Sequence, residues 1–239
     1  MKLLGFWLAC AAAAVTLTDS AAAAPAPVQI TRTEIAPGVH QSNVASDGYV
    51  EQLNSVAIVN DDGVLVFDTT TRPSTARSIL AQIRKLTDKP VRYVVNSHWH
   101  PDHWSGNEVF AEANPGVQII ATEQERDFMM NLAAQWPVNL PKALAGQEKA
   151  VAERLAGDKD SAAVKAQLRL ELQQIRDLVA EQVKVKRTYP NVTYTDRLTM
   201  RRGGREMQLI SVTGDAAGTT VLWLPKGRIL VTGDAGCYP

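Results

Sequence analysis

Apolar residues fall in short runs through the first part of the chain, and turn-forming residues separate those runs. Residues 55–59 and 64–67 are two such runs, and Asn60-Asp61-Asp62-Gly63 lies between them. Asn, Asp and Gly are the residues that tight hairpin turns favour. The pattern therefore predicts two antiparallel strands joined by this turn.

In the next segment, the spacing of apolar residues changes to that of a helix. Residues 75–86 repeat apolar side chains at steps of three and four, which predicts a helix, and Asp88-Lys89-Pro90 ends it. Residues 91–95, which are mostly apolar, then predict a buried strand, and residues 117–121 predict another strand. The order strand, helix, strand indicates the α/β class.

Residues 123–187 are rich in Ala, Leu, Gln, Glu and Lys, which are strong helix formers, and we expect a helical insertion here. Trp136-Pro137 and Leu140-Pro141 are expected to break its first part. The second part carries one apolar stripe, made of Val164, Leu168, Leu172, Ile175, Val179 and Val183. The stripe fits either a helix packed on its own domain, which we favour, or a lid or partner face near a site.

Strand patterns resume after Pro190. Predicted strands cover residues 192–195, 206–212, 219–224 and 228–232, with Pro225-Lys226-Gly227 as the turn between the last two. Of the 239 residues, 45% are apolar and 21% are charged, which is ordinary for a globular protein and enough for one domain. Lys plus Arg and Asp plus Glu are both 25, so no excess positive charge favours nucleic acid or an anionic membrane surface.

Residues 1–24 have the pattern of a secretory signal peptide. Lys2 precedes a largely apolar stretch, and a run of small residues precedes Pro25. We expect cleavage there, a mature domain at residues 25–239, periplasmic or secreted localisation and no stable membrane span. A membrane anchor and a lipid-modified Cys10 are the alternatives. After cleavage Cys237 is the remaining cysteine, so we expect no intramolecular disulfide.

Three of the four histidines lie between residues 98 and 103. Imidazole and carboxylate groups bind zinc and related divalent metals, and residues two apart in extended backbone point the same way. His98 and His100 can therefore share one metal ion, since Pro101 biases His100 toward extended backbone. Asp102 and His103 follow where the chain turns and can face a second position. The fourth histidine, His40, follows Pro37-Gly38 and is expected in a solvent-exposed turn.

The stretch from Asn96 to Asn107 resembles the signature loop of the metallo-β-lactamase-fold hydrolases. Two more segments resemble that family in the same order: residues 64–69, an early strand ending in Asp68, and residues 222–234, a late hairpin ending in Asp234. The resemblance implies an αββα metallo-β-lactamase-like sandwich with the metals at one edge of its two sheets. It also implies a small-molecule substrate.

Carried over by resemblance, the first metal ion is held by His98 and His100 and the second by Asp102 and His103. Asp234 bridges the ions or binds the second one, and Asp68 supports the site by hydrogen bonding from behind the ligands. Asp215 stands where the family has a histidine. Aspartate can bind zinc through oxygen, so Asp215 is either a ligand that alters the charge of the site or a replacement that weakens the first position. The family continues past the counterpart of Asp234 and supplies a final histidine, so we expect the C-terminal part of the fold to be missing.

These residues predict an exported, metal-dependent hydrolase with one or two zinc ions. A metal with an open position lowers the pKa of bound water to around 7, and the resulting hydroxide attacks an ester, thioester, lactam or related bond. Asp102 orients that hydroxide as the catalytic residue. The alternatives are a non-catalytic metal-binding relative, suggested by Asp215, and the same site holding iron or manganese. Trp99 and Trp104 flank the ligands, and either line the site or pack against the sheet.

Overall fold

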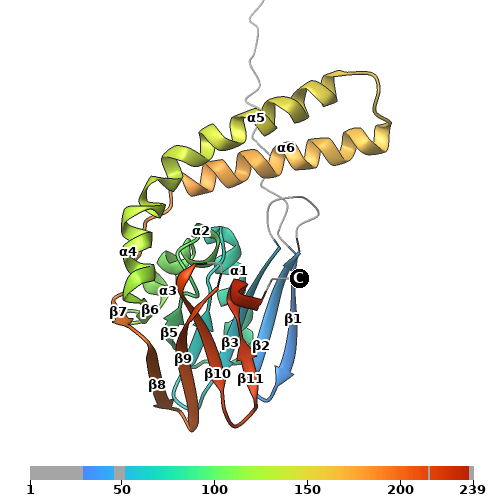
Figure 1. Cartoon of the computed structure of the whole chain (residues 1–239). Coiled ribbons are helices and arrows are strands. Elements are labelled where there is room, and N and C mark those ends of the chain that lie inside the picture. The colour runs from blue at the N-terminus through green and yellow to red at the C-terminus, as the bar shows by residue number, and fades with distance from the viewer. Residues whose placement is uncertain (1–28, 46–51, 215, 237–239) are drawn as a thin grey trace, which may run out of the picture.

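Two β-sheets face each other in the computed structural model, which describes residues 29–45, 52–214 and 216–236 (Figure 1). The larger sheet has the strand order β1-β2-β3-β4-β5-β6-β7 and the smaller one β11-β10-β9-β8. The strands of the larger sheet are β1 (Gln29–Ala36), β2 (Val39–Ala45), β3 (Gln52–Val59), β4 (Val64–Phe67), β5 (Val91–Val95), β6 (Gln118–Thr122) and β7 (Val192–Tyr194). Those of the smaller sheet are β8 (Arg197–Arg202), β9 (Arg205–Thr213), β10 (Ala217–Leu224) and β11 (Ile229–Val231).

Strand direction decides where the polar residues gather. Strands β1 to β4 pair antiparallel, whereas β4, β5, β6 and β7 run parallel. The carboxyl ends of β4 and β5 therefore meet at one edge of the sheet, and the residues that follow them are Asp68 and Asn96. Parallel strands commonly place binding residues at this edge.

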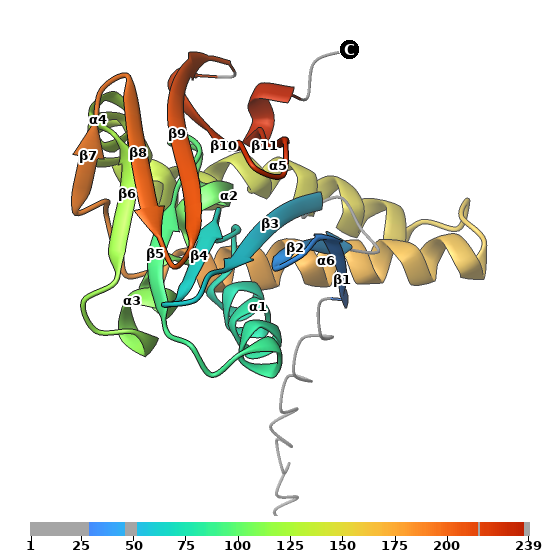
Figure 2. The same ribbon diagram turned by 90° about the horizontal axis from the view of Figure 1, so that it is seen from below.

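Apolar side chains pack on both faces of the larger sheet. On one face, Ile79 and Ile83 of α1 (Pro73–Leu86) and Phe110 of α3 (Asn107–Ala113) pack on the sheet. On the other face, Phe67 and Met207 belong to the core between the two sheets. Burying each such side chain contributes about 1.5–3 kcal/mol. The view from below separates these layers (Figure 2).

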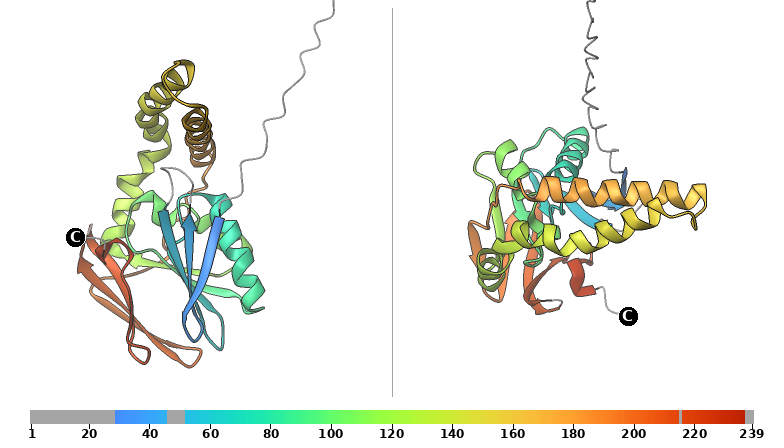
Figure 3. Two further views of the ribbon diagram at one scale, coloured as in Figure 1. Left: turned by 90° about the vertical axis from the view of Figure 1, so that its right-hand side faces the viewer. Right: turned by 90° about the horizontal axis from the view of Figure 1, so that it is seen from above.

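Helices follow β6 as expected. These are α4 (Glu123–Asn131), the short 3-10 helix η1 (Ala133–Gln135), α5 (Trp136–Ala156) and α6 (Ala162–Gln182). Thr122 and Ser161 cap α4 and α6 by accepting hydrogen bonds from backbone N–H groups. Helices α5 and α6 lie side by side as a hairpin that projects from the sandwich (Figure 3). Among the described residues, none of the helices combines the length and apolar character that crossing a membrane requires.

The α/β class and the sandwich predicted from the sequence are confirmed, and the predicted β5 matches residue for residue. Three expectations were wrong. Pro141 lies inside α5, which continues past it. His40 lies in β2, which is paired with β1 on one side and β3 on the other, and it is buried there. Its Nε2 is 3.9 Å from an oxygen of Glu34. The stripe on α6 was wrong at its two ends: Val164 and Val183 are exposed, whereas Leu168 and Ile175 are buried as expected.

Candidate metal centre

The histidine loop leaves the end of β5 and turns directly into a helix. His100 precedes α2 (Pro101–Trp104), and its backbone is extended, with φ −62° and ψ 134°. Pro101 both imposes that extended backbone and starts the helix at its first turn. The helix returns His103 toward His98, and the two ring centroids lie 4.1 Å apart. The local sequence thus brings two histidines five positions apart into contact.

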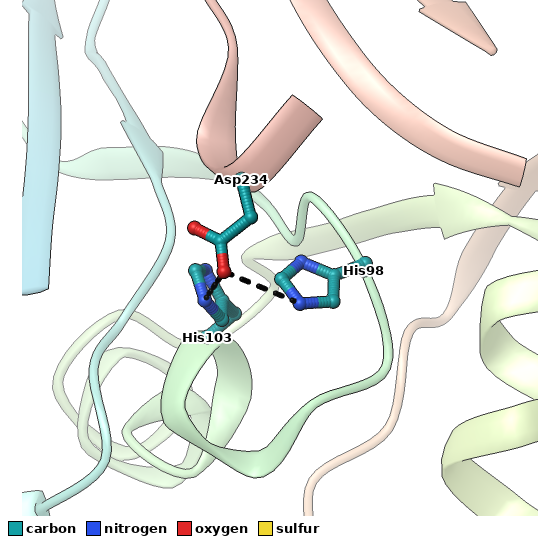
Figure 4. Close-up of side chains that lie close together, drawn as sticks. All are labelled: His98, His103 and Asp234. Carbon is teal, nitrogen blue, oxygen red and sulfur yellow. Dashed lines mark ion pairs between the residues drawn. The ribbon is translucent and has the colours of Figure 1, made fainter. Parts of the chain in front are cut away.

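His98, His103 and Asp234 form one cluster, in which one ligand atom from each residue lies within 4.8 Å of the others (Figure 4). Oδ2 of Asp234 is 3.4 Å from Nε2 of His103 and 3.9 Å from Nε2 of His98. Asp234 follows β11 in the 3-10 helix η2 (Gly233–Gly236), so the two sheets contribute different sides of the cluster. Gly233 has φ 51°, and a Cβ there would lie 2.7 Å from Cβ of Ser97.

Hydrogen bonds behind the rings orient both histidines. Nδ1 of His103 lies 2.8 Å from Oδ2 of Asp68, and it is the donor because a carboxylate only accepts. Ser97 donates its Oγ proton to the same carboxylate at 2.8 Å, so Oγ accepts from Nδ1 of His98 at 3.0 Å. With both Nδ1 atoms donating, the Nε2 atoms, which lie toward Asp234, are the ring nitrogens left to bind a metal ion. Metal-binding histidines characteristically have this arrangement.

The loop that carries Asp68 has an unusual backbone. Asp68 and Thr70 adopt left-handed conformations with φ 60° and 70°, each costing about 1–3 kcal/mol. The histidine loop holds this segment through backbone bonds from Thr69 N to His103 O at 2.9 Å and from Gly106 N to Thr70 O at 3.2 Å. A Cβ at Gly106 would lie 2.1 Å from Thr69 O, so the two loops approach too closely for any other residue.

Charges around the cluster set its protonation. Burial, followed by the nearby His103, lowers the pKa of His98 to about 4, so this ring is neutral at pH 7. Burial also acts to lower the pKa of His103, but Asp68, Asp102 and Asp234 outweigh it and raise that pKa well above its ordinary value.

The carboxylates of Asp102 and Asp234 stay ionised at neutral pH. Burial acts to raise the pKa of Asp102, but His103 outweighs it and holds that pKa below the usual range. Hydrogen bonding to His103 is the main cause of the lowered pKa of Asp234. In the metal-free cluster a positive His103 therefore faces two negative carboxylates, which leaves an excess of negative charge.

The donor set fits a divalent metal ion. Two ligands of a tetrahedral zinc ion lie roughly 3.3 Å apart. Nε2 of His98 is 2.9 Å from Nδ1 of His100, and Nε2 of His103 is 3.4 Å from Oδ2 of both Asp102 and Asp234. Nε2 of His103 is buried and faces these two carboxylates, so a metal ion would bind at this nitrogen in place of its proton.

The other residues proposed from the sequence fall into two groups. Asp102 lies in α2 with its side chain 40% exposed, and Asp68 is 3% exposed directly behind His103. Asp215, the signal segment, Cys10 and Cys237 lie outside the described residues. How the ligands divide between two ions stays a prediction.

Trp104 is a packing residue, buried with Met129 and Ala133 and donating from Nε1 to Trp99 O at 2.8 Å. Trp99 is half-buried, with its ring 4.5 Å from that of His100. Reasoning from the sequence assigned no role to Ser97. The sequence feature that could have indicated a role is its position at the end of a buried strand, directly before the first histidine.

A cavity of about 230 Å³ opens beside the cluster. Asp68, His103 and Asp234 form its polar end. The rest of its wall combines apolar side chains with two amides and a hydroxyl, and includes Ile35, Gln41, Asn54, Val56, Phe67, Leu230, Val231, Thr232 and Gly233. A small organic molecule in this cavity would reach the cluster with one polar end.

Known proteins show the same fold and related sequences. Residues 48–239 match the family model of the metallo-beta-lactamase superfamily. A solved metallo-beta-lactamase from Pontibacter korlensis superposes with a TM-score of 0.58 over 85% of this chain and 71% of that one, at 17% identity, which shows a shared fold.

Two curated relatives are hydrolases. A linear primary-alkylsulfatase of a Pseudomonas species is 28% identical over 179 residues, covering 72% of this chain and 31% of its own length. A hydroxyacylglutathione hydrolase of Gloeobacter violaceus is 32% identical over 93 residues, covering 37% of this chain and 32% of its own length. The chain thus spans about a third of the length of these relatives. With a family match over most of its residues and a His/Asp cluster at the sheet edge, the chain belongs to the metallo-beta-lactamase superfamily.

Proposed function

We propose that this protein is an exported, zinc-dependent hydrolase that cleaves an ester bond of a small molecule. The observation that carries the proposal is the cluster of His98, His103 and Asp234, with both Nε2 atoms presented to one carboxylate. A bound zinc ion supplies Lewis-acid polarisation of the scissile bond and activates water near neutral pH. Iron and manganese suit the same donor atoms, and metal analysis distinguishes them.

The side chains have separate roles in this proposal. His98, His100, His103 and Asp234 hold the metal, with Asp215 as a further candidate ligand. Asp102 is the catalytic residue: its pKa is held low, so its carboxylate is ionised at neutral pH and can accept a hydrogen bond from the attacking water. Asp68 keeps His103 in one tautomer and one orientation through the bond at 2.8 Å.

For the substrate, we propose a sulfate ester of an unbranched alcohol. The alkylsulfatase relative matches 72% of this chain, about twice the share that the thioester hydrolase matches. The cavity beside His103 adds support, because the exposed side chains of Ile35 and Leu230 offer apolar contact to an alkyl chain. A glutathione thioester is the second candidate, supported by the match to the hydroxyacylglutathione hydrolase.

A substrate panel tests both proposals. The purified full chain is assayed on a linear alkyl sulfate, a glutathione thioester and a β-lactam, before and after chelation. We expect turnover of the alkyl sulfate that chelation abolishes and zinc restores. His103→Ala should abolish it, whereas the matched control His40→Gln, outside the cluster, should retain it. Turnover that survives both chelation and His103→Ala would refute the proposal.

Export is proposed from the pattern of residues 1–24, with periplasmic or secreted localisation. Expression of the full chain in a bacterial host, followed by mass measurement of the protein in each fraction, tests it. We expect a product cleaved near Ala24 outside the cytoplasm. A product that keeps residues 1–24 and stays in the cytoplasm would contradict export.

A further inference from the structure

The last turns of α6 contact the segment that follows Asp68. Gln182 donates from Nε2 to Thr71 O, and Arg72 donates from Nη2 to Gln174 O at 3.0 Å. Glu181 accepts from Ser74 N at 3.0 Å and from Ser74 Oγ at 2.7 Å. One face of α6 therefore binds the chain from Thr71 to Ser74 at three points.

Two of these contacts are unusual for a surface helix. Gln182 is 1% exposed, so its amide makes its hydrogen bond to Thr71 in the interior of the protein. Helix α1 begins at Pro73 without a side-chain cap of its own. Glu181 supplies that cap from a different element, with a negative charge at the positive end of the helix. The projecting hairpin is thus joined to the sandwich by specific polar bonds.

The segment held in this way leads directly to the cluster. Only Thr69 and Thr70 separate Asp68 from Thr71, and they are buried, with left-handed backbone at Asp68 and Thr70. Such backbone persists only where surrounding contacts fix it. The histidine loop holds one side of the segment, through Thr69 and Thr70. Helix α6 holds the next residues along the chain.

We infer that Gln182 and Glu181 are positioning residues of the metal centre, acting through the Thr71–Ser74 segment on the carboxylate of Asp68 and so on the ring of His103. The inference rests on the proposed function as far as metal binding is concerned. Without these bonds the left-handed loop relaxes, and the Asp68 carboxylate no longer holds Nδ1 of His103 at 2.8 Å. Metal affinity then falls, because a ligand that loses its supporting hydrogen bond binds less tightly.

Two variants of the full chain test the inference. Gln182→Leu keeps the volume of the side chain but cannot donate to Thr71, and Glu181→Gln removes the capping charge. The matched control is Arg176→Gln on the same helix, which removes an exposed ion pair with Glu148 of α5 at 2.8 Å and leaves the bonds to the Thr71–Ser74 segment in place. Circular dichroism and urea unfolding confirm that each variant is folded.

The first readout is binding of Co²⁺ alone, measured by competition with a chelator and by the visible spectrum of the bound ion. We expect the affinity to fall about tenfold in Gln182→Leu and in Glu181→Gln with an altered spectrum, and less than about twofold in Arg176→Gln. Unchanged affinity and spectrum in both positioning variants would overturn the inference.

The second readout separates this inference from the proposed function. In metal-free protein, we expect NMR to detect the Nδ1–H proton of His103, because its bond to Asp68 should slow its exchange with solvent. We expect faster exchange in Gln182→Leu than in wild type and no change in Arg176→Gln. A wild type that binds no Co²⁺ refutes the proposed function, whereas equal exchange of this proton in all variants overturns the positioning role.

Discussion

His98 is buried beside His103, and this should make the stability of the metal-free protein depend on pH. Its pKa is lowered from 6.5 to about 4, with burial as the largest cause. Below pH 6.5 the unfolded chain binds a proton at this residue while the folded chain does not, so the free energy of unfolding falls as pH decreases. The loss begins near the unfolded pKa and levels off below the folded pKa.

The size of the effect follows from the shift. A difference of one pKa unit corresponds to about 1.4 kcal/mol, so the full effect is roughly 3 kcal/mol, of which about 2 kcal/mol develops between about pH 7.5 and about pH 4.5. His103 behaves oppositely, because its pKa is raised. Its stabilising effect is complete below pH 6.5 and therefore constant across the lower part of this window.

Urea unfolding of chelator-treated protein at the two pH values measures the effect. We compare wild type with His98→Gln, which keeps a polar side chain that does not titrate. Between about pH 7.5 and about pH 4.5, the free energy of unfolding of wild type should fall by about 2 kcal/mol more than that of the variant. Equal losses in the two proteins would show that burial of His98 does not suppress its protonation.

Three further substitutions probe the cluster and its supports. Asp68→Asn retains an acceptor for Ser97 N but cannot accept from Nδ1 of His103, so zinc affinity measured by chelator competition should fall about 10- to 100-fold, and unchanged affinity would contradict the role of Asp68. Gly233→Ala places a Cβ 2.7 Å from Cβ of Ser97, so it should displace Asp234 and weaken zinc binding, and an unaltered titration would contradict that geometry. Gly106→Ala meets Thr69 O at 2.1 Å, so urea unfolding should show a loss of at least about 2 kcal/mol, and wild-type stability would refute the close approach of the two loops.

Elements in which apolar residues form a clear run or repeat could be predicted from the sequence. Strand β4 is a continuous apolar run because it is buried throughout, and β5, which lies between parallel neighbours, is apolar except for the exposed Arg92. The strands β1, β2 and β8 were missed. Most side chains of β1 are exposed, so it shows no alternation that marks a strand, and in β8 Met200 is the one buried residue.

In the metal centre, too, some residues could be predicted from the sequence and others could not. His98, His100, Asp102 and His103 could be proposed from their spacing, because they lie within six residues on one loop. Asp234 could be proposed only from the family resemblance, since no local pattern indicates that η2 of the second sheet meets the histidine loop of the first. The role of α6 could not be predicted either. Its apolar stripe suggested packing, whereas the polar residues Glu181 and Gln182 make its contacts near Asp68.

Metal content of the purified full chain tests the central claim most directly. Wild type, His103→Ala and His40→Gln are dialysed with zinc and then without it, and elemental mass spectrometry gives the zinc retained per chain. We expect wild type and His40→Gln to retain one or two zinc ions and His103→Ala to retain less. A wild type that retains no divalent metal, or a His103→Ala variant that retains as much as wild type, would contradict a metal centre built on His98, His103 and Asp234.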